Sequence, residues 1–159
     1  MNNEQMNEVI DWLLEKCQEL KIKVINSSEW PKDWPSRSLA ILRIIYYNPN
    51  WKSSHELPIS LAHEMGHVIT QSPEFNSLNA ESINLKIEDK ANLVAIQLIL
   101  KYIQLHDLNF ETEIQLAETF AIPDYMLHEL DFAVKHQAKS NLLPNSIRLL
   151  NDGRFSSTI

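Results

Sequence analysis

Two histidines and a glutamate lie within one short string, His63-Glu64-Met65-Gly66-His67. Residues four apart share a face of an α-helix, so the two imidazoles can bind one Zn²⁺ ion at about 2.0–2.1 Å. The glutamate beside the first histidine is placed to take a proton from a water molecule that the zinc activates. The spacing therefore predicts a zinc site with hydrolytic chemistry, as in zinc peptidases.

The residues around this string favour a helix over 58–71. Pro58 is tolerated in the first turn of a helix, where its missing N–H would have no partner. The dipeptide Ser72-Pro73 marks the end of the helix. Apolar residues recur at helical spacing on a face away from the histidines, at Leu61, Met65 and Val68. The alternative is a purely structural histidine pair, which this context makes the weaker interpretation.

A catalytic zinc site usually has three protein ligands, so one ligand must come from outside the string. Glu88 is the best candidate, because it lies near the start of a second helical segment. Asp89 competes with it, and Glu81 is a weaker candidate. Asn92 lies one turn beyond Glu88, where its side-chain carbonyl could accept the free ring N–H of a ligating histidine. An acidic residue at a helix start is also explained by the helix dipole alone.

The same strings resemble those of the ImmA/IrrE-type metallopeptidases. Residues 59–67 read Ile-Ser-Leu-Ala-His-Glu-Met-Gly-His, and residues 88–95 read Glu-Asp-Lys-Ala-Asn-Leu-Val-Ala. Residues 44–50 are similar to a strand of the family that ends in asparagine. The resemblance covers roughly residues 20–130 and is more specific than the histidine motif alone.

This resemblance implies that His63, His67 and Glu88 are the metal ligands and that Glu64 is the general base. It also implies a substrate class, because members of the group act on helix-turn-helix transcriptional repressors, often of phage or other mobile elements. The chain departs from the family pattern at Lys90, where an acidic residue is usual, and at other positions after Glu88. None of these departures affects an expected ligand.

Composition and charge favour a small cytoplasmic enzyme. The chain has 159 residues with 44% hydrophobic and 22% charged residues, which suits one domain with a real core. A net charge of −7 argues against direct nucleic-acid binding. The lone Cys17 excludes an internal disulfide and suits a reducing compartment. No signal peptide and no apolar run of about 18 residues is seen, so we expect no membrane association.

The apolar patterns predict an α+β fold, in which a small N-terminal β-sheet packs against a mainly helical, zincin-like domain with a C-terminal helical hairpin. We expect one domain over 1–137 and a poorly ordered tail over 138–159. Helices are predicted over 4–20, 58–71, 85–106, 111–120 and 123–137. Strands are predicted over 21–26 and 38–48, the latter as one strand or a hairpin without an identifiable turn.

Several side chains could stabilise the negative charge that develops in a peptidase transition state. The sequence does not choose among Tyr46, Tyr47, His55 and Tyr102. Three tryptophans could line a substrate groove but are more typical of core plugs, namely Trp30, Trp34 and Trp51. His106 shares a helical face with Glu88, but a separation of ~27 Å along the helix excludes it as a ligand of the same ion.

Residues 116–127 resemble part of a helix-turn-helix unit. From Tyr102 to Val134 the chain has no Lys or Arg but several carboxylates, so this segment would repel phosphate. We interpret it as a helical hairpin or as an acidic docking surface for a protein, with a basic DNA-binding repressor as the expected partner. The sequence does not predict the oligomeric state.

A second function class stays open from the sequence. The same metal site could be a structural staple in a non-catalytic protein that binds and sequesters a repressor or another partner. A structural zinc site is closed by four protein ligands, whereas a catalytic one keeps an open position. No clear fourth ligand is present in the sequence, which favours the enzyme.

Overall fold

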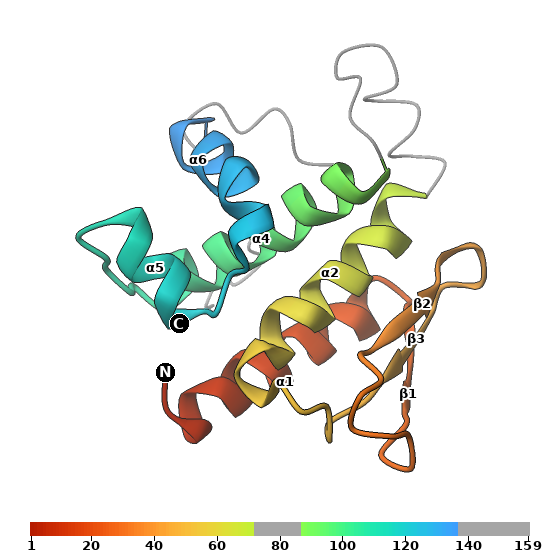
Figure 1. The fold of residues 1–159 in the computed structure, drawn as a ribbon. Coiled ribbons are helices and arrows are strands. Elements are labelled where there is room, and N and C mark those ends of the chain that lie inside the picture. Colours follow the sequence, from red (N-terminus) through yellow and green to blue (C-terminus); the bar gives the residue numbers. More distant parts are fainter. Residues whose placement is uncertain (72–86, 137–159) are drawn as a thin grey trace, which may run out of the picture.

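The computed structural model describes residues 1–71 and 87–136. The helices are α1 (Asn3–Glu19), α2 (Leu57–Thr70), α4 (Ile87–Leu105), α5 (Glu113–Thr119) and α6 (Leu127–His136), and the strands are β1 (Lys23–Asn26), β2 (Arg37–Leu39) and β3 (Ile44–Tyr47). Helix α2 runs through the middle of the molecule, with α1 and the sheet on one side and α4 to α6 on the other (Figure 1). The predicted α+β class is confirmed.

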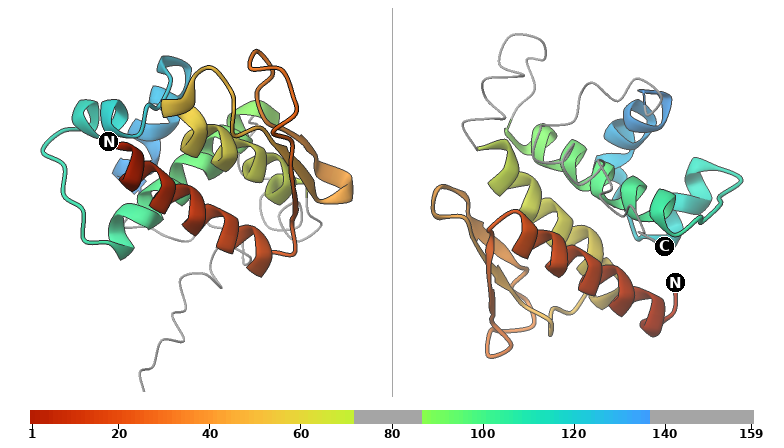
Figure 2. Two further views of the ribbon diagram at one scale, coloured as in Figure 1. Left: turned by 90° about the horizontal axis from the view of Figure 1, so that it is seen from below. Right: turned by 180° about the vertical axis from the view of Figure 1, so that it is seen from behind.

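Helix α1 begins with a capping box, in which the side chains of Asn2 and Gln5 each accept a backbone N–H of the other residue. Its apolar face packs against α2, as Figure 2 shows from behind. The thiol of Cys17 is fully buried on this face, and burial raises its pKa to about 12. This cysteine therefore packs in the core.

The sheet has the order β1-β3-β2. Strands β1 and β3 are parallel, while β2 runs antiparallel to β3. The predicted segment 38–48 is thus a hairpin, and its turn is a 3₁₀ helix over Ala40–Leu42 followed by Arg43 in the left-handed conformation with φ 55°. The Arg43 guanidinium donates to the Leu20 carbonyl at 2.5 Å, which fixes the turn to the end of α1.

Helix α2 makes its most extensive helix packing with α4. The two backbones touch at Gly66, where an added Cβ would lie 2.3 Å from the Ala91 carbonyl oxygen. Only a glycine permits this approach, because any larger residue would overlap the backbone of α4. The contact brings the first turn of α4 next to the histidines of α2.

Helices α5 and α6 form the predicted C-terminal hairpin, and α6 packs on α4. The acidic segment was expected to be exposed, but its residue Glu129 is buried. The Oε2 atom of Glu129 has no hydrogen-bond partner within the described residues. Glu129 lies on the face of α6 that also buries Leu130 and Ala133, so its position follows from helical periodicity.

Three expectations lie outside the described residues. They concern Ser72-Pro73 as the end of a helix, the tail 138–159 and Glu81 as a weaker ligand candidate. The division of the chain after residue 137 stays a prediction. Within the described ranges, none of the helices combines the length and the apolar character that crossing a membrane requires.

Candidate metal centre

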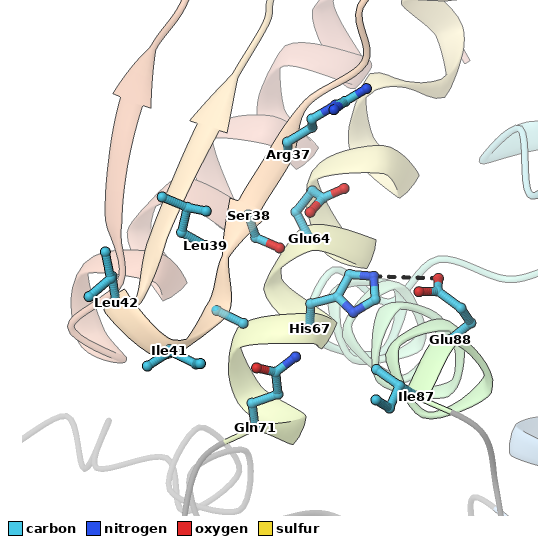
Figure 3. Close-up of a pocket in the computed structure, with 11 residues that line it drawn as sticks. Arg37, Ser38, Leu39, Ile41, Leu42, Glu64, His67, Gln71, Ile87 and Glu88 are labelled. Carbon is cyan, nitrogen blue, oxygen red and sulfur yellow. Dashed lines mark ion pairs between the residues drawn. The ribbon is translucent and has the colours of Figure 1, made fainter.

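Three side chains from two helices converge at the contact between α2 and α4. The Nε2 atoms of His63 and His67 lie 3.0 Å apart, as expected for residues four apart on one helix. Oε2 of Glu88, in the first turn of α4, lies 3.5 Å from each of these nitrogens. Figure 3 shows the carboxylate of Glu88 facing the ring of His67 across the cleft.

These atoms fit a zinc ion. Four ligands placed tetrahedrally at about 2.0–2.2 Å from zinc are separated by roughly 3.3–3.5 Å, close to the distances between the three atoms. Imidazole and carboxylate are also ligand types that zinc prefers. Among the described residues, the group of potential ligands at this position consists of His63, His67 and Glu88. Asp89, the competing candidate, is not in it.

Burial prepares the first histidine for metal binding. The side chain of His63 is 18% exposed, and desolvation lowers its pKa, with a smaller lowering contribution from His67 and opposing ones from Glu88 and Asn92. A lowered pKa keeps the imidazole neutral near pH 7, as a metal ligand must be.

Asn92 is buried one turn beyond Glu88, and its amide is near enough to raise the pKa of His63. However, Nδ1 of His63 and Oδ1 of Asn92 are both buried and neither has a hydrogen-bond partner within the described residues. A buried N–H and a buried carbonyl without partners are costly, so a small movement that pairs them is favourable. The role of Asn92 in fixing the ring of His63 stays a prediction.

Glu64 lies on the side of α2 that faces strand β2. Burial raises its pKa, while hydrogen bonds from the Ser38 hydroxyl and the Ser38 backbone N–H, together with His67, lower it. Figure 3 shows Ser38 and Glu64 side by side. A carboxylate that is partly desolvated and lies beside a hydroxyl group is suited to accept a proton and return it.

A cleft of about 630 Å³ opens beside these residues. Its walls are β2, the turn that follows it, and the facing parts of α2 and α4, and they include Glu64, His67 and Glu88. His67 and Glu88 line the cleft, so the group of candidate ligands is open to it on that side. This arrangement can hold a metal ion, a water molecule and a carbonyl group next to a carboxylate base.

None of the four side chains left open as charge stabilisers lines this cleft. Tyr102 is buried against Trp12 and His106 near the far end of α4, and Tyr47 is buried near Asp11. Tyr46 stacks on Trp30 with ring centroids 5.6 Å apart. The remaining candidate, His55, pairs with Glu56 at 3.7 Å.

The tryptophans also lie outside the cleft lining. Trp51 packs against the core, and Trp30 packs between Tyr46 and Trp34. For Trp51 the expected packing in the core is confirmed, whereas for Trp34 it is wrong, because Trp34 is 51% exposed. His106 stacks on Tyr102, so the structure agrees with its exclusion as a ligand.

Two residues near the site were not singled out from the sequence. Ser38 is one, because a serine in a three-residue strand carries no signal that it will face a glutamate of another element. Tyr125 is the other: its pKa is raised by partial burial and then by Glu56 and Glu88, although the residue is 68% exposed. Tyr125 stands in a short 3₁₀ helix that packs on α4.

The family comparison covers most of the chain. A family model described as the IrrE N-terminal-like domain, which belongs to a peptidase family, matches residues 17–128. No curated protein and no solved structure matches the chain significantly. The matched segment runs from the end of α1 to the start of α6 and includes the candidate ligands and Glu64.

Proposed function

The chain belongs to the peptidase family of the IrrE N-terminal-like domain, and on this premise we propose that it is a zinc-dependent metalloendopeptidase. His63, His67 and Glu88 are the proposed ligands. The observation that carries the proposal is the convergence of three ligand atoms, within 4.8 Å of one another, beside an open cleft that is lined by His67, Glu88 and Glu64.

In the proposed mechanism each residue has one task. When bound, zinc supplies Lewis acidity, which activates water and polarises the scissile carbonyl. Glu64 accepts the proton of the attacking water and delivers it to the leaving amine. Ser38 lowers the pKa of the Glu64 carboxyl group and so favours the ionised form that accepts the proton.

The rival function is sequestration of a partner by a zinc-stapled protein. The open cleft favours the enzyme. A structural zinc site is closed by protein ligands and needs neither an open position on the metal nor a carboxylate base beside it. A Glu64→Gln variant separates the two functions. It keeps all three proposed ligands, so we expect it to bind zinc and stay folded but to lose hydrolysis. Cleavage at the normal rate by this variant would exclude Glu64 as the base.

The proposed substrate is a basic, helix-turn-helix transcriptional repressor of a phage or mobile element, cut at a limited site in the cytoplasm. The support in this chain is the set of exposed carboxylates on and near the hairpin of α5 and α6, such as Glu111, Glu118 and Asp124. They would attract a basic partner and raise the rate of encounter. Asp131 contributes less, because Lys135 pairs with it at 2.6 Å.

The experiment uses a repressor encoded beside this protein's own gene. Zinc-loaded protein is incubated with that repressor and, separately, with casein, with and without a chelator, and Glu64→Gln serves as the inactive control. We expect discrete, chelator-sensitive repressor fragments and little cleavage of casein. Chelator-sensitive degradation of casein with an intact repressor would overturn the proposed substrate. Binding of the repressor without cleavage of either protein would favour sequestration.

A further inference from the structure

Four large apolar side chains are exposed around one end of the cleft. Leu39, Ile41 and Leu42 come from the end of β2 and its turn, and Ile87 comes from the first turn of α4. Ile41 is 89% exposed and Ile87 is 61% exposed. Single exposed apolar residues are normal, but a group that lines one hollow indicates a binding surface.

The two ends of the cleft differ in chemistry. Figure 3 shows Arg37 at one end and Ile41 and Ile87 at the other, with His67 and Glu88 between them. All five residues line the same cleft. Ile87 directly precedes Glu88, so its Cα lies about 3.8 Å from that of the candidate ligand. The apolar end therefore begins one residue away from the metal centre.

The strand beside the cleft can position an extended peptide. Within the described ranges β2 pairs with β3 alone, so it is an edge strand, and its residues Arg37, Ser38 and Leu39 line the cleft. A peptide lying extended along this edge advances about 3.3 Å per residue. A peptide whose scissile carbonyl lies at the metal centre would then place a neighbouring side chain at Ile41 and Ile87.

We propose that Ile41 and Ile87 form a specificity pocket for one apolar side chain directly beside the bond that is cut. The pocket takes a Leu-, Ile-, Met- or Phe-like side chain and discriminates against polar ones, because a polar group here would lose water without gaining a hydrogen-bond partner. Arg37 lies at the opposite end of the cleft, so this preference for apolar side chains applies only at the end formed by Ile41 and Ile87. This inference rests on the proposed metallopeptidase function.

The first experiment measures binding without catalysis. The probes are N-acetyl-leucine hydroxamate and N-acetyl-asparagine hydroxamate, which share the chelating group and differ in a side chain of similar size. Their affinities for the zinc-loaded protein are measured by calorimetry. We expect the leucine probe to bind about tenfold more tightly, from the apolar area that it removes from water.

The variants Ile41→Asn and Ile87→Asn test whether these two residues cause the preference for the leucine probe. We expect each to reduce it several-fold and both together to abolish it. The matched control is Ile114→Asn, which changes an equally exposed isoleucine on α5, outside the cleft. All three positions are highly exposed, so the variants should fold normally, and thermal unfolding verifies this.

Cleavage then separates the two proposals. Peptides with one central leucine, and twins with asparagine there, are digested and the cut bonds are identified by mass spectrometry. The pocket is supported if the protein binds the leucine probe more tightly and if Ile41→Asn and Ile87→Asn remove this preference. If, in addition, no peptide is cut, the apolar pocket stands as a binding site while the proposed peptidase function fails. Cleavage without such a preference, or a preference that the double variant retains, overturns the pocket and leaves the peptidase function intact. If neither hydroxamate binds, both proposals fail.

Discussion

The two walls of the candidate metal centre are built differently. The wall formed by α2 supplies His63 and His67, whose side chains are only 18% and 15% exposed, from a helix buried along most of its length. The wall formed by α4 supplies Glu88, which is 68% exposed in the first turn of its helix. Burial fixes the imidazoles and keeps the metal-free His63 neutral, whereas water screens the carboxylate. We infer that α2 determines metal affinity more than α4 does.

The largest expected effect comes from removing the buried ligands. A double variant His63→Ala, His67→Ala should lose stoichiometric zinc, as elemental analysis of the purified protein would show. Zinc binding worth 10–16 kcal/mol over a full ligand set implies losses of roughly 100- to 1000-fold per ligand. Glu88→Ala should lie at the lower end of this range and His63→Ala at the upper end. Full metal retention in the double variant would refute the site, and equal losses in the two single variants would refute the difference between the walls.

The next largest effect concerns the contact that joins the walls. Gly66→Ala should lower the free energy of unfolding by about 2–3 kcal/mol, because the new methyl group would overlap the Ala91 carbonyl. The sign of this change in the free energy of unfolding is informative, because Gly→Ala inside a helix normally stabilises a protein by about 1 kcal/mol. Urea unfolding measures the change, and Ser60→Ala on the same helix is the control. A more stable Gly66→Ala variant would show that the two helices are farther apart than described.

A smaller effect is expected from Asn92, which lies on the α4 wall but acts on a residue of the α2 wall. Removing a side chain that orients a ligating histidine typically lowers metal affinity by about 10- to 100-fold. Competition with a chromogenic chelator would measure this loss in Asn92→Ala. The exposed Asn109→Ala should bind zinc normally. Unchanged affinity in Asn92→Ala would mean that the buried Nδ1 of His63 finds another acceptor.

The smallest expected effect is a shift in pH dependence. Ser38 lowers the pKa of Glu64, so Ser38→Ala should raise that pKa. Glu64 must be ionised to accept a proton, and the acidic limb of the kcat/KM profile should therefore move to higher pH, with little change on the plateau. A profile of cleavage rate between pH 4 and 8 tests this. A shift to lower pH would mean that Ser38 does not stabilise the carboxylate.

The sequence predicted the α2 wall better than the rest of the site, for a physical reason. The relation of His63 to His67 is local, since helix geometry alone places residues four apart on one face. The position of Glu88 depends on how α4 crosses α2, and the sequence left Asp89 as an alternative. The positions of Ser38 and Tyr125 depend on tertiary packing of short elements, for which no periodic pattern exists.

The hairpin of β2 and β3 shows the same limit. Its turn could not be located in the sequence, because Arg43 is not a residue type that usually marks a left-handed position. A distant contact, the hydrogen bond from Arg43 to Leu20, stabilises that conformation. The acidic segment was predicted as a surface from composition, which cannot distinguish the exposed face of α6 from the face that buries Glu129.

The close approach at Gly66 also bears on how such sites are recognised in genomes. The usual search pattern requires two histidines and a glutamate and accepts any residue at the two positions between them. In this fold one of those positions accepts only the smallest residue, because the backbone of α4 occupies the space of a side chain. The informative pattern thus specifies one more residue, a glycine directly before the second histidine, than the ligand chemistry requires. A search that includes this glycine would reject chance matches that have the ligands but lack room for the second helix.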